Sequence, residues 1–400
     1  MISLDEAHQY VLDRVVRLPV VTVPLADAAG LVLAADAMAA EQVPPFDNTA
    51  MDGFAVRAAD TVGAPLVLEM IGTVAAGAAF DGECGAGQAV RIMTGAPMPL
   101  GADAVVMVER TALDEAAESV EIEIEVPVGN HVRTAGEDVQ PGDLLFPAGT
   151  QLTAGHLGVL ASVGFQVVNV VRRPRVGVVS TGDELVDDGR ALEPGEIRDS
   201  NRRTLLALVA EAGWDAVDLG IAVDEKADIE ASFVEGAASC DAVLSSGGVS
   251  MGAFDYVKVV LDEIGDMRWM QIAIKPAKPF AFGLIGETPM FGLPGNPVSS
   301  MVSFELMAKP ALRKMAGEAD LGPRVVRATS VDSLGHSADG KTHFLRVEGE
   351  QDSYGRWTVR RAGGQGSHQL TAMARADALA MVPDGSAMAP GDEVDIIVLR

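Results

Sequence analysis

The spacing of apolar residues divides the first part of the chain into regions of different character. Residues 3–18 have helical spacing. Between residues 41 and 137 short apolar runs alternate with glycine and proline, which predicts a small β domain. Residues 144–170 return to the character of the opening segment. We therefore interpret 41–137 as a β domain inserted into an elongated scaffold and dimerisation domain, residues 1–40 with 138–170. The candidate apolar stripe of the first helix is Ala7, Val11, Val15 and Val16.

From residue 171 short apolar strands alternate with helical segments. This alternation predicts a doubly wound, mainly parallel α/β domain over 171–318, with helices on both faces of the sheet. Residues 319–400 return to short strands with glycine turns and predict a C-terminal β-barrel. The predicted fold class is thus multidomain α/β plus β. The predicted strands of the α/β domain are 176–180, 216–223, 242–244, 267–274, 280–284 and 290–293, and its helices are 201–212, 226–238, 256–264 and one that starts at Asn296-Pro297.

Four polar loops follow predicted strands of this sheet. Ligands of an open parallel sheet bind beyond the carboxyl ends of the strands, so all four loops can open onto one crevice. Glycines let backbone N–H groups approach an anion, and a helix N-terminus adds a favourable dipole. For the loop at residues 245–250, a tight turn with capping serines explains the sequence as well as an anion site does. The loops are Ser180-Thr181-Gly182-Asp183-Glu184, Ser245-Ser246-Gly247-Gly248-Val249-Ser250, Lys275-Pro276-Ala277-Lys278-Pro279 and Gly292-Leu293-Pro294-Gly295-Asn296-Pro297.

The third loop holds two lysines in a strongly acidic chain. Lys and Arg total 30 against 57 Asp and Glu, and this net charge of −27 argues against a nucleic-acid binder. Two ammonium groups held together favour an anion between them, with a solvated turn as the alternative.

Carboxylates at the same edge indicate Mg²⁺, which binds oxygen ligands and bridges carboxylate to phosphate. Each could instead cap a helix, Asp199 above all. They are Asp183, Glu184, Asp199, Asp224 and Asp255.

Other site classes are not predicted. Cys84 and Cys240 are too few for a disulfide framework or a thiolate cluster. No apolar run approaches the roughly 18 residues that span a bilayer, and the start lacks a signal-peptide core, so we expect a cytoplasmic protein with no membrane partner. The histidines show no paired ligand spacing, so no zinc site is predicted. They are His8, His131, His156, His336, His343 and His368.

Eight motifs, in order from end to end, resemble those of the molybdopterin molybdotransferases, the family of MoeA proteins and the gephyrin E domain. The set is far more specific than any single motif. Two departures are Ala277, where the family commonly has glycine, and Ala253-Phe254 before Asp255, where an acidic residue is common. The motifs are PPFDNTAMDGFAVR (44–57), IMTGAP (92–97), GEDV (136–139), STGDEL (180–185), SSGGVS (245–250), IKPAKP (274–279), GLPGNPVSS (292–300) and GQGSH (364–368).

The resemblance implies a transferase that completes molybdenum cofactor biosynthesis. It implies Mg²⁺-dependent insertion of molybdate into adenylylated molybdopterin, with release of AMP, by an elongated homodimer whose clefts lie at the dimer interface. A transient contact with the molybdopterin adenylyltransferase that supplies the substrate is also expected. The residues suit this chemistry, because a tetrahedral dianion needs positive charge and directional donors. Tungstate stays open as an alternative oxyanion.

By match to the family motifs, the resemblance assigns roles to four groups of residues. The molybdate pocket is assigned to Lys275, Lys278, Arg346 and Ser367. Mg²⁺ binding and adenylate cleavage are assigned to Asp224, Asp255 and Glu184. Further substrate contacts are assigned to Thr181, Gly182, Ser246, Gly247, Gly248, Ser250, Pro294 and Asn296. Catalytic roles in the N-terminal region are assigned to Asp52, Thr94 and Asp138, although plain hairpin turns would also explain Asp52 and Thr94.

Three other functions compete with this interpretation. A pterin adenylyltransferase shares the α/β domain but is normally a single domain, which leaves residues 1–170 and 320–400 unexplained. A receptor-clustering scaffold of the gephyrin type uses extra domains and a linker that 400 residues do not provide. A plain pterin carrier would not need the lysine pair or the carboxylates Asp224 and Asp255.

Overall fold

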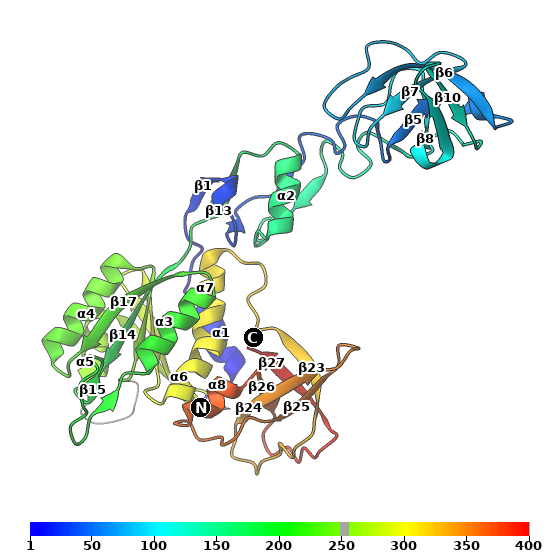
Figure 1. Ribbon diagram of the computed structural model, residues 1–400. Helices are drawn as coiled ribbons and strands as arrows, with labels where there is room; N and C mark the ends of the chain where they lie inside the picture. Colours follow the sequence, from blue (N-terminus) through cyan, green and yellow to red (C-terminus); the bar gives the residue numbers. More distant parts are fainter. Residues whose placement is uncertain (249–255, 400) are drawn as a thin grey trace.

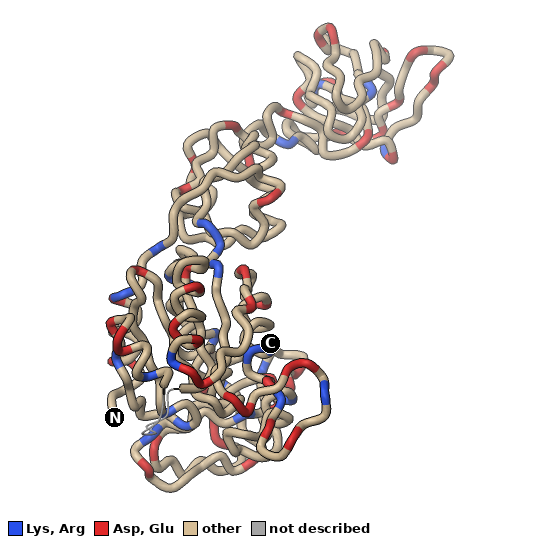
Figure 2. Tube along the Cα trace, turned by 90° about the vertical axis from the view of Figure 1, so that its left-hand side faces the viewer, with Lys and Arg blue, Asp and Glu red and all other residues tan. Residues whose placement is uncertain are grey.

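The chain forms an elongated molecule of four parts, shown by a computed structural model that describes residues 1–248 and 256–399 (Figure 1). An α/β domain and a β-barrel lie side by side at one end, a small middle module follows, and the inserted β domain lies at the other end. Acidic residues are spread over all four parts (Figure 2). None of the helices in the described ranges is long and apolar enough to cross a membrane.

The α/β domain contains a six-stranded sheet in the order β17-β14-β18-β22-β21-β19. The first four strands are parallel, and β21 runs antiparallel to both of its neighbours, so β19 again points the same way as β22. The carboxyl ends of five strands therefore meet at one edge. The strands are β14 (Arg175–Thr181), β17 (Asp215–Ala222), β18 (Ala242–Ser246), β19 (Asp266–Gln271), β21 (Pro279–Ile285) and β22 (Thr288–Leu293), and β15 (Leu185–Val186) pairs with β16 (Ile197–Arg198) beside them.

Helices cover both faces of this sheet, as its doubly buried strands predict. In β14, Val178 packs into the core on the side of α3, whereas Val179 packs on the side of α4. The alternation of side chains along a strand thus builds two cores, and the domain has three layers. The helices are α3 (Asn201–Glu211), α4 (Lys226–Ser239), α5 (Tyr256–Ile264), α6 (Pro297–Ser303), the π-helical segment η4 (Phe304–Ala308) and α7 (Lys309–Ala316).

Helix α1 (Leu4–Leu12) departs from the predicted division of the chain. Its stripe, Ala7 with Val11 and Val15, is buried in the α/β core beside α3, α6 and α7, whereas Val16 is exposed. The helix is also shorter than residues 3–18. The apolar spacing was therefore predicted correctly, but it anchors the N-terminus to the α/β domain instead of the scaffold.

The chain runs through the middle module twice, once before and once after the inserted domain. Strand β1 (Val20–Pro24) pairs antiparallel with β13 (Val167–Val171), which also pairs with β2 (Val32–Leu33). Leu33, Leu152, Leu160 and Val170 form its small core. The remaining elements are η1 (Leu25–Asp27), β3 (Ala37–Met38), β12 (Leu144–Phe146) and α2 (Ala154–Ser162).

The inserted domain is a six-stranded sheet in the order β8-β5-β7-β6-β10-β9. Its core includes Phe54, Val106 and Ile122. Strand β10 lies between β6 and β9 and is antiparallel to both. The elements are β4 (Asn48–Thr49), β5 (Gly53–Val56), η2 (Ala58–Thr61), β6 (Leu66–Val74), β7 (Gln88–Ile92), β8 (Ala104–Met107), η3 (Val108–Arg110), β9 (Thr111–Asp114), β10 (Ser119–Ile122) and β11 (Val132–Arg133).

The C-terminal domain is a closed five-stranded barrel, because β24 pairs with β26 in addition to the chain of pairings β24-β25-β23-β27-β26. Short strand β20 (Ile274–Lys275) adds to β24, which fastens the barrel to the α/β domain. Phe344 and Leu379 of the barrel enter the α/β core. The elements are β23 (Val325–Ser330), β24 (Thr342–Gln351), β25 (Trp357–Arg361), α8 (Leu370–Arg375), β26 (Ala378–Val382) and β27 (Glu393–Val398).

Candidate functional site

Three of the four predicted loops meet in a cavity of about 190 Å³ beyond the carboxyl ends of β14, β18 and β22. A methyl group added to Gly247 would lie 3.0 Å from the Thr181 hydroxyl, and one added to Gly295 would lie 3.8 Å from the Gly247 Cα. The loops are therefore packed backbone to backbone. The predicted residues that line the cavity are Thr181, Glu184, Ser246 and Gly247.

The glycines of the second loop are required by its geometry. Gly247 and Gly248 have φ angles of +101° and +69°, and a Cβ on Gly248 would come within 2.3 Å of Val257. Larger residues would thus be both strained and obstructed. The Gly247 N–H donates to the Leu293 carbonyl at 3.1 Å, so this amide is already used. Ser250 lies outside the described residues.

Three carboxylates gather beside the cavity, and within the described ranges no cationic side chain pairs with them. Asp183 Oδ1 accepts a hydrogen bond from the Asp224 backbone N–H at 2.8 Å. The pKa of Asp224 is raised, first by partial burial and then by the negative charges of Asp183 and Glu184. Asp224 and Glu184 are therefore brought together as predicted from the strand ends. Asp255 falls outside the described residues.

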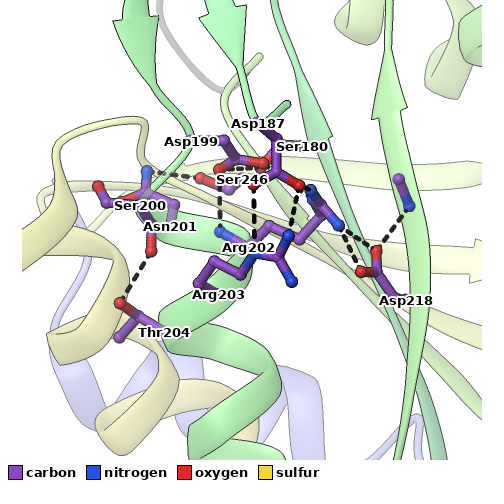
Figure 3. A network of polar contacts seen from close by, with 11 residues as sticks. Ser180, Asp187, Asp199, Ser200, Asn201, Arg202, Arg203, Thr204, Asp218 and Ser246 are labelled. Carbon is purple, nitrogen blue, oxygen red and sulfur yellow. Dashed lines mark hydrogen bonds and ion pairs between the residues drawn. The ribbon is translucent and has the colours of Figure 1, made fainter. Parts of the chain in front are cut away.

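A polar network at the start of α3 lines one side of the cavity (Figure 3). Asn201 Nδ2 donates to Ser246 Oγ and to the Gly295 carbonyl, both at 2.7 Å, and so ties two of the loops together. Next to it, Arg202 is buried, with 4% of its surface exposed. It makes ion pairs with three carboxylates, those of Asp187, Asp199 and Asp218.

Asp199 caps α3 and also holds Arg202. Its Oδ1 accepts from the Arg202 backbone N–H at 3.1 Å and from the Ser180 hydroxyl at 3.0 Å, and its Oδ2 accepts from Arg202 Nε at 2.9 Å. Burial alone would lower the pKa of the Arg202 guanidinium, but Asp199 and Asp218 raise it above its ordinary value. Asp199 is thus a structural cap, which was the alternative expected for it. Asn201 and Arg202 were missed, because a polar run at a helix start gives no sign of burial.

The lysine loop lies where the α/β domain meets the barrel. Lys275 is exposed on β20, and Lys278 is half-buried, with its carbonyl accepting from the Ile272 N–H at 2.8 Å. Between them Ala277 has a φ of +74°, in the left-handed region that favours glycine. The departure from the family glycine therefore falls on a residue whose backbone conformation strains any side chain.

Arg346, which the resemblance assigns to the molybdate pocket, lies on β24 beside the 364–368 loop. Its side chain is fully buried, and its Nη2 donates to the carbonyls of Gly364 and Gly366 at 3.0 and 3.1 Å. Its Nε has no hydrogen-bond partner, and among the described residues it has no carboxylate partner. Burial lowers the pKa of this guanidinium to about 10. Arg346 therefore holds the 364–368 loop in place through these two hydrogen bonds.

The other predicted residues near this loop act through their backbones. The Ser367 carbonyl accepts from the Val298 N–H at 3.1 Å, which joins the 364–368 loop to the start of α6. Asn296 occupies the N-cap position of α6 before Pro297, as expected, but its side chain makes no capping bond. Its predicted capping role is thus corrected. Pro294 and Gly182 lie in the loops that leave β22 and β14.

Two of the three predicted residues of the N-terminal region, Asp52 and Thr94, flank β5 and β7 of the inserted domain, which lies at the other end of the molecule from the α/β domain (Figure 1). Asp52 Oδ1 accepts from both the Thr94 N–H and the Thr94 hydroxyl, each at 2.7 Å. These bonds lower the pKa of Asp52, the hydroxyl contributing most. Asp138 is exposed, and its N–H donates to the Val43 carbonyl at 3.0 Å. The structure thus joins Asp52 to Thr94 but brings neither to the α/β domain.

Family models match almost the entire chain. A model described as a probable molybdopterin binding domain matches residues 177–314, the part that holds the cavity. Models of the MoeA N-terminal region (domains I and II) and the MoeA C-terminal region (domain IV) match residues 2–164 and 335–399. The cavity thus lies in a domain of the molybdopterin-binding class.

Relatives match over their full length. Molybdopterin molybdenumtransferase of Haemophilus influenzae is 39% identical over 382 residues, 94% of this chain and 93% of the relative. Molybdopterin molybdenumtransferase 2 of Mycobacterium tuberculosis is 38% identical over 394 residues, 96% of each chain. A crystal structure of the molybdopterin biosynthesis moeA protein of Pyrococcus horikoshii covers all of both chains with a TM-score of 0.84 at 29% identity. The chain belongs to the MoeA family.

Proposed function

We propose that this chain is a molybdopterin molybdotransferase, a transferase of molybdenum cofactor biosynthesis. It takes molybdate and adenylylated molybdopterin, forms the molybdenum–dithiolene bonds, and releases AMP when water cleaves the bond between the two phosphates. The reaction class is carried over from relatives named molybdopterin molybdenumtransferase that match from end to end. The observation that carries it to this molecule is the group of three carboxylates beside a glycine-lined cavity.

The carboxylate group fits Mg²⁺ as the metal cofactor. Asp183, Glu184 and Asp224 offer hard oxygen ligands, and the raised pKa of Asp224 reports negative charge that a divalent cation would neutralise. When bound, Mg²⁺ offsets charge on phosphate oxygens. Glu184 and Asp224 would hold it, with Asp255 as a further candidate.

The chain's own residues have separate tasks in this proposal. The loops at Thr181 and Ser246 enclose the phosphate end of the pterin, because their glycines leave the backbone accessible. Lys275 and Lys278 attract molybdate with two ammonium groups. Arg346 gives that anion a further positive charge from within the barrel wall and, through its bonds to Gly364 and Gly366, sets the position of Ser367.

We further propose that the active unit is a homodimer. The inserted domain, with strands β5 and β7 next to Asp52 and Thr94, lies at the end of the molecule opposite to the α/β domain, so a second copy of the chain would have to bring these residues to the cavity (Figure 1). Substrate delivery by transient contact with the adenylyltransferase suits a ligand whose dithiolene is sensitive to air and water.

A single reaction tests the proposed function. The protein is supplied with adenylylated molybdopterin, molybdate and Mg²⁺, and AMP is followed by chromatography. We expect AMP release that depends on both molybdate and Mg²⁺. Release that is indifferent to molybdate would make the protein a hydrolase of the adenylate, and formation of adenylate from ATP and molybdopterin would make it an adenylyltransferase.

A further inference from the structure

Three side chains with metal-binding atoms converge on the barrel outside the cavity. His336 and Asp339 lie in the loop between β23 and β24, and His343 lies on β24. One ligand atom from each lies within 4.8 Å of the others. The sequence spacing gave no sign of this, because the loop that precedes β24 is irregular and folds His336 back over the strand.

The two imidazole rings lie face to face. They are stacked, with centroids 3.4 Å apart and an interplanar angle of 1°. Zinc binds imidazole nitrogens at about 2.0–2.1 Å in a tetrahedral arrangement, with each ring plane directed at the ion. The rings must therefore rotate out of the stack to aim their lone pairs at one ion.

Hydrogen bonds orient the ligands in the way metal sites require. His336 Nδ1 lies 2.8 Å from the Ser337 carbonyl, and its Nε2 lies 3.5 Å from the Val382 carbonyl, a long contact that an ion at Nε2 would replace. A backbone carbonyl on the far nitrogen is the usual outer partner of a metal-bound histidine. Asp339 is held in turn by Asp384, whose Oδ1 accepts from the N–H groups of Asp339 and Gly340 at 2.8 and 3.0 Å.

The third ligand is already in contact with the second histidine. His343 is buried, and its Nε2 lies 3.2 Å from both oxygens of Asp339.

We propose that His336, Asp339 and His343 form a binding site for one divalent ion of the zinc class, with imidazole–imidazole–carboxylate ligation and a fourth position open to water. Lys341 competes with the ion, because its ammonium lies 3.0 Å from the Asp339 carboxylate. Lys275 also faces this carboxylate, at 3.9 Å. The site is independent of the proposed transferase reaction.

The test titrates the full chain, stripped with a chelator, with Zn²⁺ alone at pH 7.5 in a calorimeter. We expect one saturable ion per chain from this site. His343→Gln and His336→Gln should each weaken binding by more than the roughly 10- to 100-fold that loss of an outer partner costs. Lys341→Gln should strengthen it, because the competing ammonium is gone.

His156→Gln is the matched control, because His156 closes a capping box with Thr153 in which glutamine serves as well. It should bind Zn²⁺ like the parent chain. Circular dichroism verifies folding, and Asp339→Asn replaces either histidine variant that does not fold, because Asp339 is exposed. Co²⁺ should give the visible absorption of a four-coordinate ion. Equal binding by the parent and these variants, or no saturable binding, would overturn the site.

Discussion

The pKa values of two carboxylates at opposite ends of the molecule are shifted in opposite directions. At the inserted domain, Asp52 accepts two hydrogen bonds from Thr94, and its pKa is lowered. At the α/β domain, Asp224 lies among other carboxylates, and its pKa is raised. The first arrangement is complete in the folded chain, whereas the second has negative charge without a cation. The difference is the one expected if the proposed Mg²⁺ site lies at the α/β end.

The largest expected effect concerns the ion pairs of Arg202, beside the cavity of the α/β domain. Arg202→Met should destabilise the α/β domain by about 3–5 kcal/mol, because it leaves carboxylates, including the buried Asp199, without their counter-charge. Arg203→Met is the control, since Arg203 is exposed and pairs only with Asp187, an interaction worth about 0–1 kcal/mol. Urea unfolding of both variants measures the difference. Equal midpoints would contradict the structural role of Arg202.

The next effect concerns catalysis. Lys278→Ala should reduce molybdate-dependent AMP release by roughly 10- to 150-fold, the value of one charge-assisted contact, with the fold unchanged. Lys226→Ala removes an equal charge from an exposed pair with Glu263 and should leave AMP release unchanged. Turnover by Lys278→Ala at the parental rate would remove this residue from the molybdate pocket.

Replacing each carboxylate by its amide tests the comparison directly, because the two stabilities should change in opposite directions. Asp224→Asn should raise the melting temperature in the absence of metal. Its raised pKa means that ionisation opposes folding, an effect that appears as the pH rises above the ordinary 3.8 through the raised value and is absent below it. Mg²⁺ should stabilise the parent chain more than this variant.

Asp52→Asn should lower the melting temperature of the inserted domain. Here the pKa is lowered, so the ionised group stabilises the fold above pH 3.8, and that contribution is lost as the pH falls through the lowered value. The gap between variant and parent should therefore close in acid. Calorimetry from pH 3 to pH 8 compares both variants, and changes of the same sign would break the contrast between the two ends.

The smallest effect concerns Ala277 in the lysine loop. Its φ of +74° costs an alanine about 1–2 kcal/mol. Glycine avoids this strain but loses more conformational entropy on folding, which offsets roughly half of the gain. Ala277→Gly should therefore stabilise the chain slightly. Ala231→Gly, on the exposed side of α4, should instead destabilise by about 1 kcal/mol. Thermal unfolding distinguishes the two, and equal losses would show that the loop is relaxed as it stands.

The sequence predicted those features that depend on local pattern. Strand periodicity and glycine placement predicted the α/β domain, the inserted β domain and the barrel. Strand ends predicted that Thr181, Glu184, Ser246 and Gly247 would meet. The motifs also predicted the family, which the relatives confirm.

Features that depend on long-range contacts were out of reach. Helix α1 packs on α7 because of a complementary surface some 300 residues later in the chain, and no local signal names that partner. Arg346 was assigned to the molybdate pocket by resemblance alone, and its burial follows from the closure of the barrel. Asn201, Arg202 and the His336–His343 stack likewise depend on how loops fold over strands.

The double passage of the chain through the middle module has a mechanical consequence. Strands β1 and β13 run side by side, and at the far end Val43 bridges to Val139, so each joint is crossed by two backbones. A pair of parallel tethers resists twisting about the long axis much more than bending across it. Thermal motion should therefore swing the inserted domain along an arc while the same face stays turned in the same direction.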